Sequence, residues 1–154
     1  MLNQLVAFIL GEQQYALSLA TVQRVVRMVE VTPLPKAPEV VLGVIDFQGN
    51  IIPVVSMRKR FGLAESEISL SDQLVVAQAG TRSVAVVVNS VTGVFERTAE
   101  EVTEAEKIVP GAQYLEGITR LDSGILFVHD LDRFLSKKEE QQLDGLLAQA
   151  GGTK

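Results

Sequence analysis

Residues 43–63 read GVIDFQGNIIPVVSMRKRFGL, and this stretch decides the fold. Apolar residues lead into Gly49-Asn50 and out again, and glycine adopts the positive φ that the first central position of a two-residue hairpin turn requires. Pro53 has no N–H to donate, so we expect a free edge or a bulge beside it. Met57 to Phe61 should form a helical turn that Gly62 ends. The stretch therefore predicts a β-hairpin followed by a short basic helix, and it offers a contact surface rather than a reactive group.

The composition favours one compact unit or two small intertwined ones. The chain has 154 residues, of which 47% are hydrophobic and 5% aromatic, and this is long enough to bury a core of Val, Leu, Ile and Ala. The net charge of −5 argues against a protein that follows nucleic-acid phosphates, because such a protein needs a basic face. The absence of Cys excludes disulfides, thiolate metal sites and a Cys nucleophile.

The first ten residues favour a soluble protein. They are apolar but have no basic start, and Gly11 and Glu12 interrupt the run. The run is too short for a signal peptide or a membrane span. We expect a cytoplasmic protein without direct insertion into a membrane.

Apolar runs along the rest of the chain predict strands joined by tight turns. These strands are expected at residues 4–10 and 13–19, 74–79 and 83–88, 92–97, 114–119 and 125–128. A short helix is expected at 20–26, a loop at 64–72 and a solvated connector at 98–110. Ser136 and Glu139 fit a capping box, which predicts a closing helix whose apolar face is formed by Leu143, Leu146, Leu147 and Ala150.

The chain also repeats itself. An offset of 69 places Gly11, Ala16, Leu19, Val22 and Val25 on Gly80, Ala85, Val88, Val91 and Val94. An offset of 74 places Gly43, Ile51, Val54, Met57 and Phe61 on Gly117, Ile125, Val128, Leu131 and Leu135. Chance alignment of Val-rich strands is the alternative explanation. The shared order of hairpin, connector, strand, hairpin and helical turn favours duplication of a small β-barrel.

Residues able to support catalysis or hold a cofactor are scarce. His129 is the sole histidine, and it closes a strand before a helical turn, so a structural or surface role is expected rather than a catalytic or metal-binding one. The glutamates at 100, 101, 104 and 106 are typical of a solvated face. The basic run at 58–60 suits a solvated helix C-terminus, with anion binding as the alternative. We expect no enzyme activity, no cofactor and no metal.

The motifs, taken in order, resemble the CheW-like adaptor family of bacterial chemosensory systems. The family signature usually reads Gly-Val-Ile-Asn-Leu-Arg-Gly, then Ile-Pro-Val-Ile-Asp-Leu-Arg and a Phe-Gly-Leu close, which residues 43–63 follow closely. The resemblance covers nearly the whole chain, and the other segments that carry it are FILGEQQYAL (8–17), VQRVVRMVEVTPLPKAP (22–38), VAVVVNSV (84–91), YLEGI (114–118) and GILFVHDLDRFL (124–135).

The resemblance implies a mainly β fold made of two intertwined, five-stranded, SH3-like barrels. A single CheW-like domain over 1–154 is expected, with a first barrel at 14–81, a second barrel at 4–13 plus 82–135, and a C-terminal helix at 136–150. It also implies an adaptor in chemotaxis signal transduction. Such a scaffold links the cytoplasmic tips of chemoreceptors to the regulatory domain of the histidine kinase CheA in this two-component system, and other CheW-like domains join it in rings of the receptor array.

The resemblance places the partner-binding surface on five residues, namely Val22, Arg24, Gly43, Gln48 and Gly49. Arg24 stands where many members have Glu, and Gln48 stands where the signature has Arg, so these two changes make the surface one unit more positive. For the two glycines, turn geometry is the alternative explanation. For Arg24 and Gln48, the alternative is an ordinary solvated side chain. Opposed charges at an interface select partners more than they add affinity.

Smaller departures from the family concern helix capping. Ser56 replaces the usual Asp before the first helical turn, whereas Asp130 keeps it in the second copy, and both can cap a helix. Asn89 stands where Asp is usual.

Three alternatives to a coupling protein remain. The first is a divergent member that serves another chemosensory-like pathway, such as one controlling pili or gliding. The second is a small-molecule sensor or an enzyme with a pocket between the barrels. The third is a nucleic-acid binder, which the negative charge and the few aromatic residues disfavour.

Overall fold

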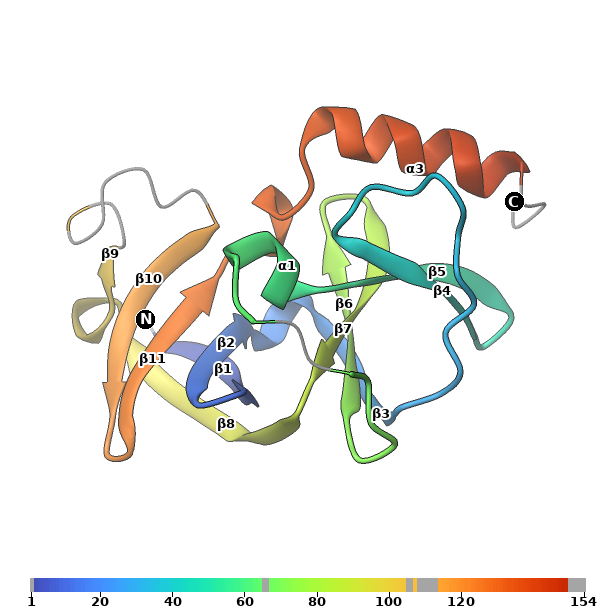
Figure 1. The fold of residues 1–154 in the computed structure, drawn as a ribbon. Helices are drawn as coiled ribbons and strands as arrows, with labels where there is room; N and C mark the ends of the chain where they lie inside the picture. Colours follow the sequence, from blue (N-terminus) through green and yellow to red (C-terminus); the bar gives the residue numbers. More distant parts are fainter. Residues whose placement is uncertain (1, 65–66, 105–106, 108–113, 150–154) are drawn as a thin grey trace.

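The computed structural model describes residues 2–64, 67–104, 107 and 114–149, and these fold into two β-sheets with short helices (Figure 1). The six-stranded sheet has the order β8-β1-β2-β11-β10-β9, and the five-stranded sheet has the order β3-β6-β7-β5-β4. The two sheets lie side by side in Figure 1, and the C-terminal helix α3 lies along the upper edge of the five-stranded one.

The bounds of the elements follow the predicted runs closely. The first half of the chain contains β1 (Leu2–Leu10), β2 (Gln13–Ser18), η1 (Leu19–Thr21), β3 (Val22–Arg27), β4 (Val41–Phe47), β5 (Asn50–Val55) and α1 (Met57–Phe61). The second half contains β6 (Gln73–Ala79), β7 (Arg82–Val88), β8 (Ser90–Thr98), η2 (Ala99–Glu101), β9 (Thr103–Glu104), β10 (Leu115–Leu121), β11 (Gly124–His129), η3 (Leu131–Arg133) and α3 (Lys137–Gln149).

The internal repeat is confirmed by the pairing of the strands. β10 and β11 begin and end 74 residues after β4 and β5. Both hairpins carry a β-bulge at the matching place, between 41 and 43 in one and between 115 and 117 in the other. A parallel pair, β2 with β11 or β7 with β5, joins the two hairpins of each sheet. Each sheet therefore takes its first hairpin from one half and its second hairpin from the other.

This exchange corrects two details of the predicted barrels. β2 was expected in the barrel at 14–81 but belongs to the six-stranded sheet, and β7 was expected in the second barrel but belongs to the five-stranded sheet. A hairpin with a tight turn keeps its two antiparallel strands together, so β2 stays with β1 in the six-stranded sheet and β7 stays with β6 in the five-stranded sheet. One sheet has six strands rather than five, and among the described residues neither sheet is closed into a barrel by hydrogen bonds.

The expected helix at 20–26 is wrong over most of its length. Only the single turn η1 is helical, and β3 begins at Val22. β-Branched residues pack well on a pleated surface. Val25 faces the largest core cluster, and its neighbour Val26 faces a different cluster. This alternation is a strand pattern.

Three apolar clusters hold the sheets together. The largest takes side chains from both sheets and from α3, where Leu143 is fully buried. The second lies within the five-stranded sheet and the third within the six-stranded sheet. The predicted capping box of α3 is confirmed, since the Glu139 N–H donates to Ser136 Oγ over 3.1 Å and the Ser136 N–H donates to Glu139 Oε1 over 2.9 Å. Ala150 and Glu106 lie outside the described residues.

Candidate interaction surfaces

The turn of the β4–β5 hairpin lies one residue earlier than predicted. Phe47 pairs with Asn50, so Gln48 and Gly49 are the two central residues. Their φ angles are 51° and 86°, and positive φ at both positions is typical of a type I′ turn. The Gly49 N–H donates to Asp46 Oδ1 over 3.0 Å. Gln48 is therefore an exposed side chain held at a fixed tip, on a backbone conformation that usually favours Gly, Asn or Asp.

The sequence predicts a free edge or a bulge at Pro53, but β5 is an inner strand between β7 and β4. Pro53 pairs with Val44 of β4, and the parallel pairing with β7 involves Val54 and Val55. In a two-residue hairpin closed by Phe47 and Asn50, the Pro53–Val44 pair is one that exchanges no hydrogen bonds. No β7 residue pairs with Pro53, so its missing N–H disrupts neither ladder.

Gly43 is buried beneath a connector rather than exposed to a partner. A Cβ added at Gly43 would lie 2.3 Å from the Thr32 carbonyl oxygen and 2.8 Å from Val31 Cγ1. The backbone of Thr32 forms two hydrogen bonds with Val44, of 2.8 and 2.9 Å. Gly117 has the same relation to Val102 and Thr103 in the second half. Gly43 thus permits close approach of the connector to β4. Its importance is therefore explained by packing rather than by turn geometry.

Val22 and Arg24 lie on β3, the opposite edge strand of the same sheet. Val22 is half-buried against the largest core cluster. Arg24 is exposed and lies across from Val76. Val26 of β3 and Phe47 of β4 pack against the same apolar cluster, so side chains from both edge strands of the sheet share one part of the core. The structure therefore places all five predicted residues on the five-stranded sheet, with four of them reaching the surface.

Aromatic side chains join the two halves around His129, which is buried as its structural role requires. Its ring stacks on Phe61 with a centroid distance of 4.4 Å and on Tyr15 with a distance of 4.8 Å. Burial lowers the pKa of His129 to about 4, and the Tyr114 carbonyl oxygen near Nδ1 opposes this only weakly. Nε2 has no hydrogen-bond partner among the described residues. His129 is therefore neutral at pH 7.

Arg60 of the basic run is a structural clamp rather than a solvated cation. Its guanidinium lies 2.5 Å from Glu139 Oε1 in the first turn of α3. It also lies 5.1 Å from the ring centre of Tyr114 and 5.4 Å from that of Phe134. Its side chain is only 13% exposed. This correction places Arg60 between the first half of the chain and α3.

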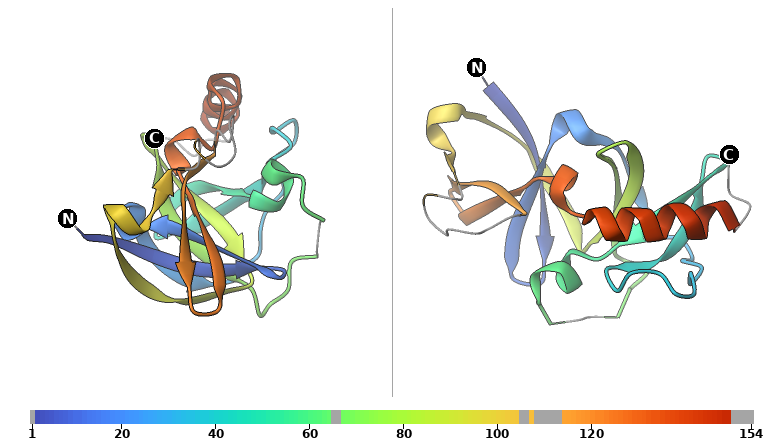
Figure 2. Two further views of the ribbon diagram at one scale, coloured as in Figure 1. Left: turned by 90° about the vertical axis from the view of Figure 1, so that its left-hand side faces the viewer. Right: turned by 90° about the horizontal axis from the view of Figure 1, so that it is seen from above.

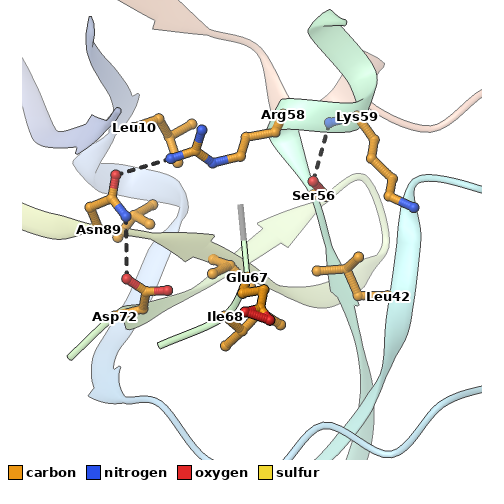
Figure 3. A pocket seen from close by; sticks show the side chains of 11 residues that line it. Leu10, Leu42, Ser56, Arg58, Lys59, Glu67, Ile68, Asp72 and Asn89 are labelled. Atoms are coloured by element: carbon orange, nitrogen blue, oxygen red, sulfur yellow. Dashed lines mark hydrogen bonds between the residues drawn. The ribbon is translucent and has the colours of Figure 1, made fainter. Parts of the chain in front are cut away.

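A small cavity of about 60 Å³ lies where β1, α1 and the segment before β6 meet (Figure 3). Asn89 is central to it. Its Oδ1 accepts hydrogen bonds from the Gly11 N–H over 2.7 Å and from Arg58 Nη2 over 3.2 Å, and its Nδ2 donates to Asp72. Ser56 accepts a bond from the Lys59 N–H over 3.2 Å, which confirms its predicted capping role. The cavity is far smaller than the pockets of about 300–1,000 Å³ that hold drug-sized ligands, and its polar groups bind one another.

Two exposed isoleucines were missed by the sequence analysis as surface residues. Ile51 is 38% exposed and Ile125 is 52% exposed, and they occupy equivalent positions just after the two hairpin turns. Asp46 pairs with Ile51 across one hairpin, and Arg120 pairs with Ile125 across the other. The repeat offset of 74 had already aligned the two isoleucines, but only the strand register places a charge beside each.

Among the described residues no group of three or more His, Cys, Asp or Glu side chains is placed to hold a metal ion. In the same part of the chain no helix is long and apolar enough to cross a membrane.

Comparison with known proteins gives consistent matches across the chain. The family model described as "CheW-like domain" matches residues 4–139. A protein of Treponema pallidum named "Chemotaxis protein CheW" is 30% identical over 149 residues, covering 93% of this chain and 88% of the relative. A protein of the same name from Klebsiella aerogenes is 26% identical and covers 94% of this chain and 88% of the relative. The crystal structure of the scaffolding protein TtCheW from Thermoanaerobacter tengcongensis has a TM-score of 0.82 at 25% identity, covering 90% of this chain and 96% of that one.

Proposed function

The chain belongs to the CheW-like family, and from this premise we propose that it couples chemoreceptors to the histidine kinase CheA. It is a non-catalytic chemotaxis adaptor. The observation that carries the finer proposal is that the match spans both halves of the repeat. An adaptor needs two separate surfaces for two partners, and a protein built from two equivalent halves presents them.

The receptor contact in this proposal uses the two edges of the five-stranded sheet. Val22 and Arg24 lie on β3, and Gln48 and Gly49 form the tip of β4–β5. Edge strands carry unpaired backbone groups and are natural contact surfaces. Gly43 contributes indirectly, because its lack of a side chain lets the connector pack against β4.

The charge of this surface selects among partners. Arg24 and Gln48 together add one positive unit relative to the family signature. Asp46, which stands where the signature has Asn, is exposed at the same tip and offsets that unit. The surface thus has the same net charge as in the family signature, but its positive charge lies on β3 and its negative charge lies at the β4–β5 tip. We expect receptors to be distinguished by the placement of charge rather than by its sum.

The kinase contact joins CheW-like barrels of the adaptor and of the CheA regulatory domain. Such contacts, repeated with other CheW-like domains, build rings in the receptor array. In this proposal the protein is cytoplasmic and stays at the membrane through its protein partners.

The test is binding of the purified chain to two separate probes encoded in the same genome, a CheA regulatory domain and a soluble fragment of a chemoreceptor tip. Isothermal titration should give one site for each probe. Arg24→Ala should weaken receptor binding and leave kinase binding unchanged, whereas Arg82→Ala, at a position away from both edges, should change neither. Binding to neither probe by the folded protein contradicts the proposal.

A divergent role in another chemosensory-like pathway is the second candidate, and exposed Arg24 favours it because Glu is usual there. The double variant Arg24→Glu with Gln48→Arg should gain binding to a receptor of a standard chemotaxis system if this candidate is right. Full binding of that receptor by the unaltered chain removes its basis.

A further inference from the structure

The six-stranded sheet carries an open groove of about 510 Å³ at one end, on the face that also carries the third apolar cluster. The groove is much larger than the cavity of about 60 Å³ around Asn89, and it falls within the range of about 300–1,000 Å³ that is usual for small-molecule sites. Figure 1 and the left view of Figure 2 show the turns of β1–β2 and β10–β11 and the strand β8 gathered at the lower side of this sheet, where the groove lies. This place corresponds to the mouth of an incompletely closed barrel, and barrel mouths are common positions for ligands.

Small residues on two paired strands leave the space for this groove. Leu5, Ala7 and Ile9 alternate along one face of β1, where Phe95 pairs with Leu5 and Gly93 pairs with Ala7. Paired residues point to the same face of a sheet. Gly93 has no side chain and Ala7 contributes only a methyl group, so the floor is low between Phe95 and Ile9, which both line the groove.

The equivalent place in the other half of the chain carries larger side chains. The repeat offset of 69 relates Ala7 to Val76 and Gly93 to Arg24. Val76 pairs with Arg24 just as Ala7 pairs with Gly93. The groove is therefore a property of the six-stranded sheet and not a consequence of the repeated fold.

One end of the groove presents hydrogen-bond acceptors. Glu12 in the β1–β2 turn is exposed, and its carboxylate has no ion pair or hydrogen bond within the part of the chain that the structure describes. Gln14 directs its amide nitrogen to Ser123 Oγ over 2.7 Å, and Thr92 donates its hydroxyl to the Ala7 carbonyl oxygen over 3.2 Å. A carboxylate, an amide oxygen and a hydroxyl oxygen are thus left for a ligand. This end suits an ammonium group, which is positively charged and offers three donors.

The other end of the groove is apolar and bordered by a cation. Phe95 is half-buried there, and the Arg97 guanidinium lies 5.9 Å from the centre of its ring. Two backbone carbonyl oxygens hold this guanidinium in place, over 2.7 and 3.1 Å. This end therefore repels a positive group and accepts an apolar one. Between the two ends, β1 extends four residues from Leu5 to Ile9, which is about 13 Å at about 3.3 Å per residue.

We propose that the groove binds a small primary amine with an apolar body, with the ammonium group at Glu12 and the body between Ile9 and Phe95. The site is separate from the receptor surface proposed above, which lies on the five-stranded sheet. Gly11 also lines the groove, and its N–H donates to Asn89 over 2.7 Å. A bound amine thus contacts the turn that is tied to the segment between the two sheets. Such binding is independent of receptor and kinase.

A titration followed by proton–nitrogen correlation NMR tests the proposal, with straight-chain phenylbutylamine as the probe at low ionic strength. The amine should shift the backbone signals of Gly11, Glu12, Thr92 and Phe95 in a saturable manner, with a Kd on the order of 1 mM, as is usual for so small a ligand. Phenylbutanol has the same body without the charge and should bind about threefold more weakly, because an exposed ion pair contributes little. Phenylbutyrate carries the opposite charge and should shift none of these signals.

Two variants and a matched control locate the site. Glu12→Gln keeps the shape of the side chain, and it should weaken amine binding about threefold and remove the difference between the amine and the alcohol. Glu39→Gln changes an exposed glutamate in the connector before β4 and should leave both affinities unchanged. Ile9→Trp fills the groove and should abolish the shifts with both probes, and thermal unfolding establishes that this variant is folded.

Three results would each overturn the proposal. The first is equal binding of the butyrate and the amine. The second is an unchanged affinity of Glu12→Gln for the amine. The third is the absence of saturable shifts at the groove when the unaltered chain is titrated with the amine.

Discussion

The Asn89 amide donates a 3.2 Å hydrogen bond to the Asp72 carboxylate, at the point where the chain leaves β7 and enters β8 in the other sheet. The other Asp72 oxygen accepts the Ser69 N–H over 2.9 Å. Asn89 also accepts bonds from Gly11 and Arg58. This residue therefore ties together the segments that meet between the two sheets.

Asn89→Asp should destabilise the protein, because it places two carboxylates in contact and removes the donor to Asp72. We expect a loss of about 2 kcal/mol in the free energy of unfolding. The double variant Asn89→Asp with Asp72→Asn reverses the roles of acceptor and donor and should recover most of the loss. Urea unfolding of the two single variants and the double variant forms a double-mutant cycle, and additive losses would show that the two side chains are not coupled.

Arg60→Ala should be much more destabilising than Arg82→Ala. Arg60 and Glu139 have side chains only 13% and 20% exposed, whereas Asp144, the partner of Arg82, is 67% exposed. Breaking a buried pair costs about 3–5 kcal/mol, and a surface pair contributes about 0–1 kcal/mol. Since the Arg60 pair is partly exposed, its loss should approach the lower end of the buried range. Chemical denaturation measures both, and equal losses would contradict the clamp assigned to Arg60.

Stability should fall as the pH is lowered from 7 to 5 because of His129. Its pKa is about 4 in the folded protein and 6.5 as a model value. The unfolded state therefore binds more protons between these values, so the free energy of unfolding rises with pH in this window. The loss from pH 7 to pH 5 should be about 2 kcal/mol.

The matched variant is His129→Phe, which keeps an aromatic ring between Tyr15 and Phe61 but cannot titrate. Its unfolding free energy should be nearly flat between pH 7 and pH 5. Calorimetry at both pH values distinguishes the two proteins, and an unchanged slope in the variant would show that other groups cause the dependence.

Gly43→Ala and Gly49→Ala should differ, although both glycines have positive φ. The new methyl group at Gly43 would meet the Thr32 carbonyl oxygen at 2.3 Å, whereas nothing lies within 4 Å of one at Gly49. In the Gly49 variant the free energy of unfolding should fall by roughly 1–2 kcal/mol, which is the cost of a left-handed conformation for a residue with a Cβ. In the Gly43 variant the free energy of unfolding should fall by about 3 kcal/mol or more, because the backbone at Thr32 must also move. Similar melting temperatures for the two variants would show that the connector yields easily.

Most strand positions could be predicted because periodicity and turn residues are local signals. The glycines at 11, 62 and 80 all have positive φ in turns or a helix C-cap. The exchange of β2 and β7 between sheets could not be predicted, because a hairpin carries no local mark of the strands it will meet. The β4–β5 turn was misplaced by one residue because Gln48 adopts a conformation for which its residue type has little preference.

The candidate surface was predictable only in part. Family resemblance gave the positions of Arg24 and Gln48, and the structure leaves both exposed. Gly43 is buried under the connector that contains Thr32. This burial could not be predicted, because the connector belongs to a proline-rich segment with no strand pattern. The roles of Arg60 and His129 depend on contacts between residues about 50 to 115 positions apart, and no spacing in the sequence encodes such contacts.

The coupling role is tested most directly by a three-component sedimentation experiment. Membranes that contain a chemoreceptor are mixed with CheA from the same genome, with and without this protein, and the CheA that sediments with the membranes is measured. The proposed coupling predicts that CheA sediments when the protein is present, and much less when it is absent or carries Arg24→Ala. Equal amounts of sedimented CheA with and without the folded protein would contradict a coupling function.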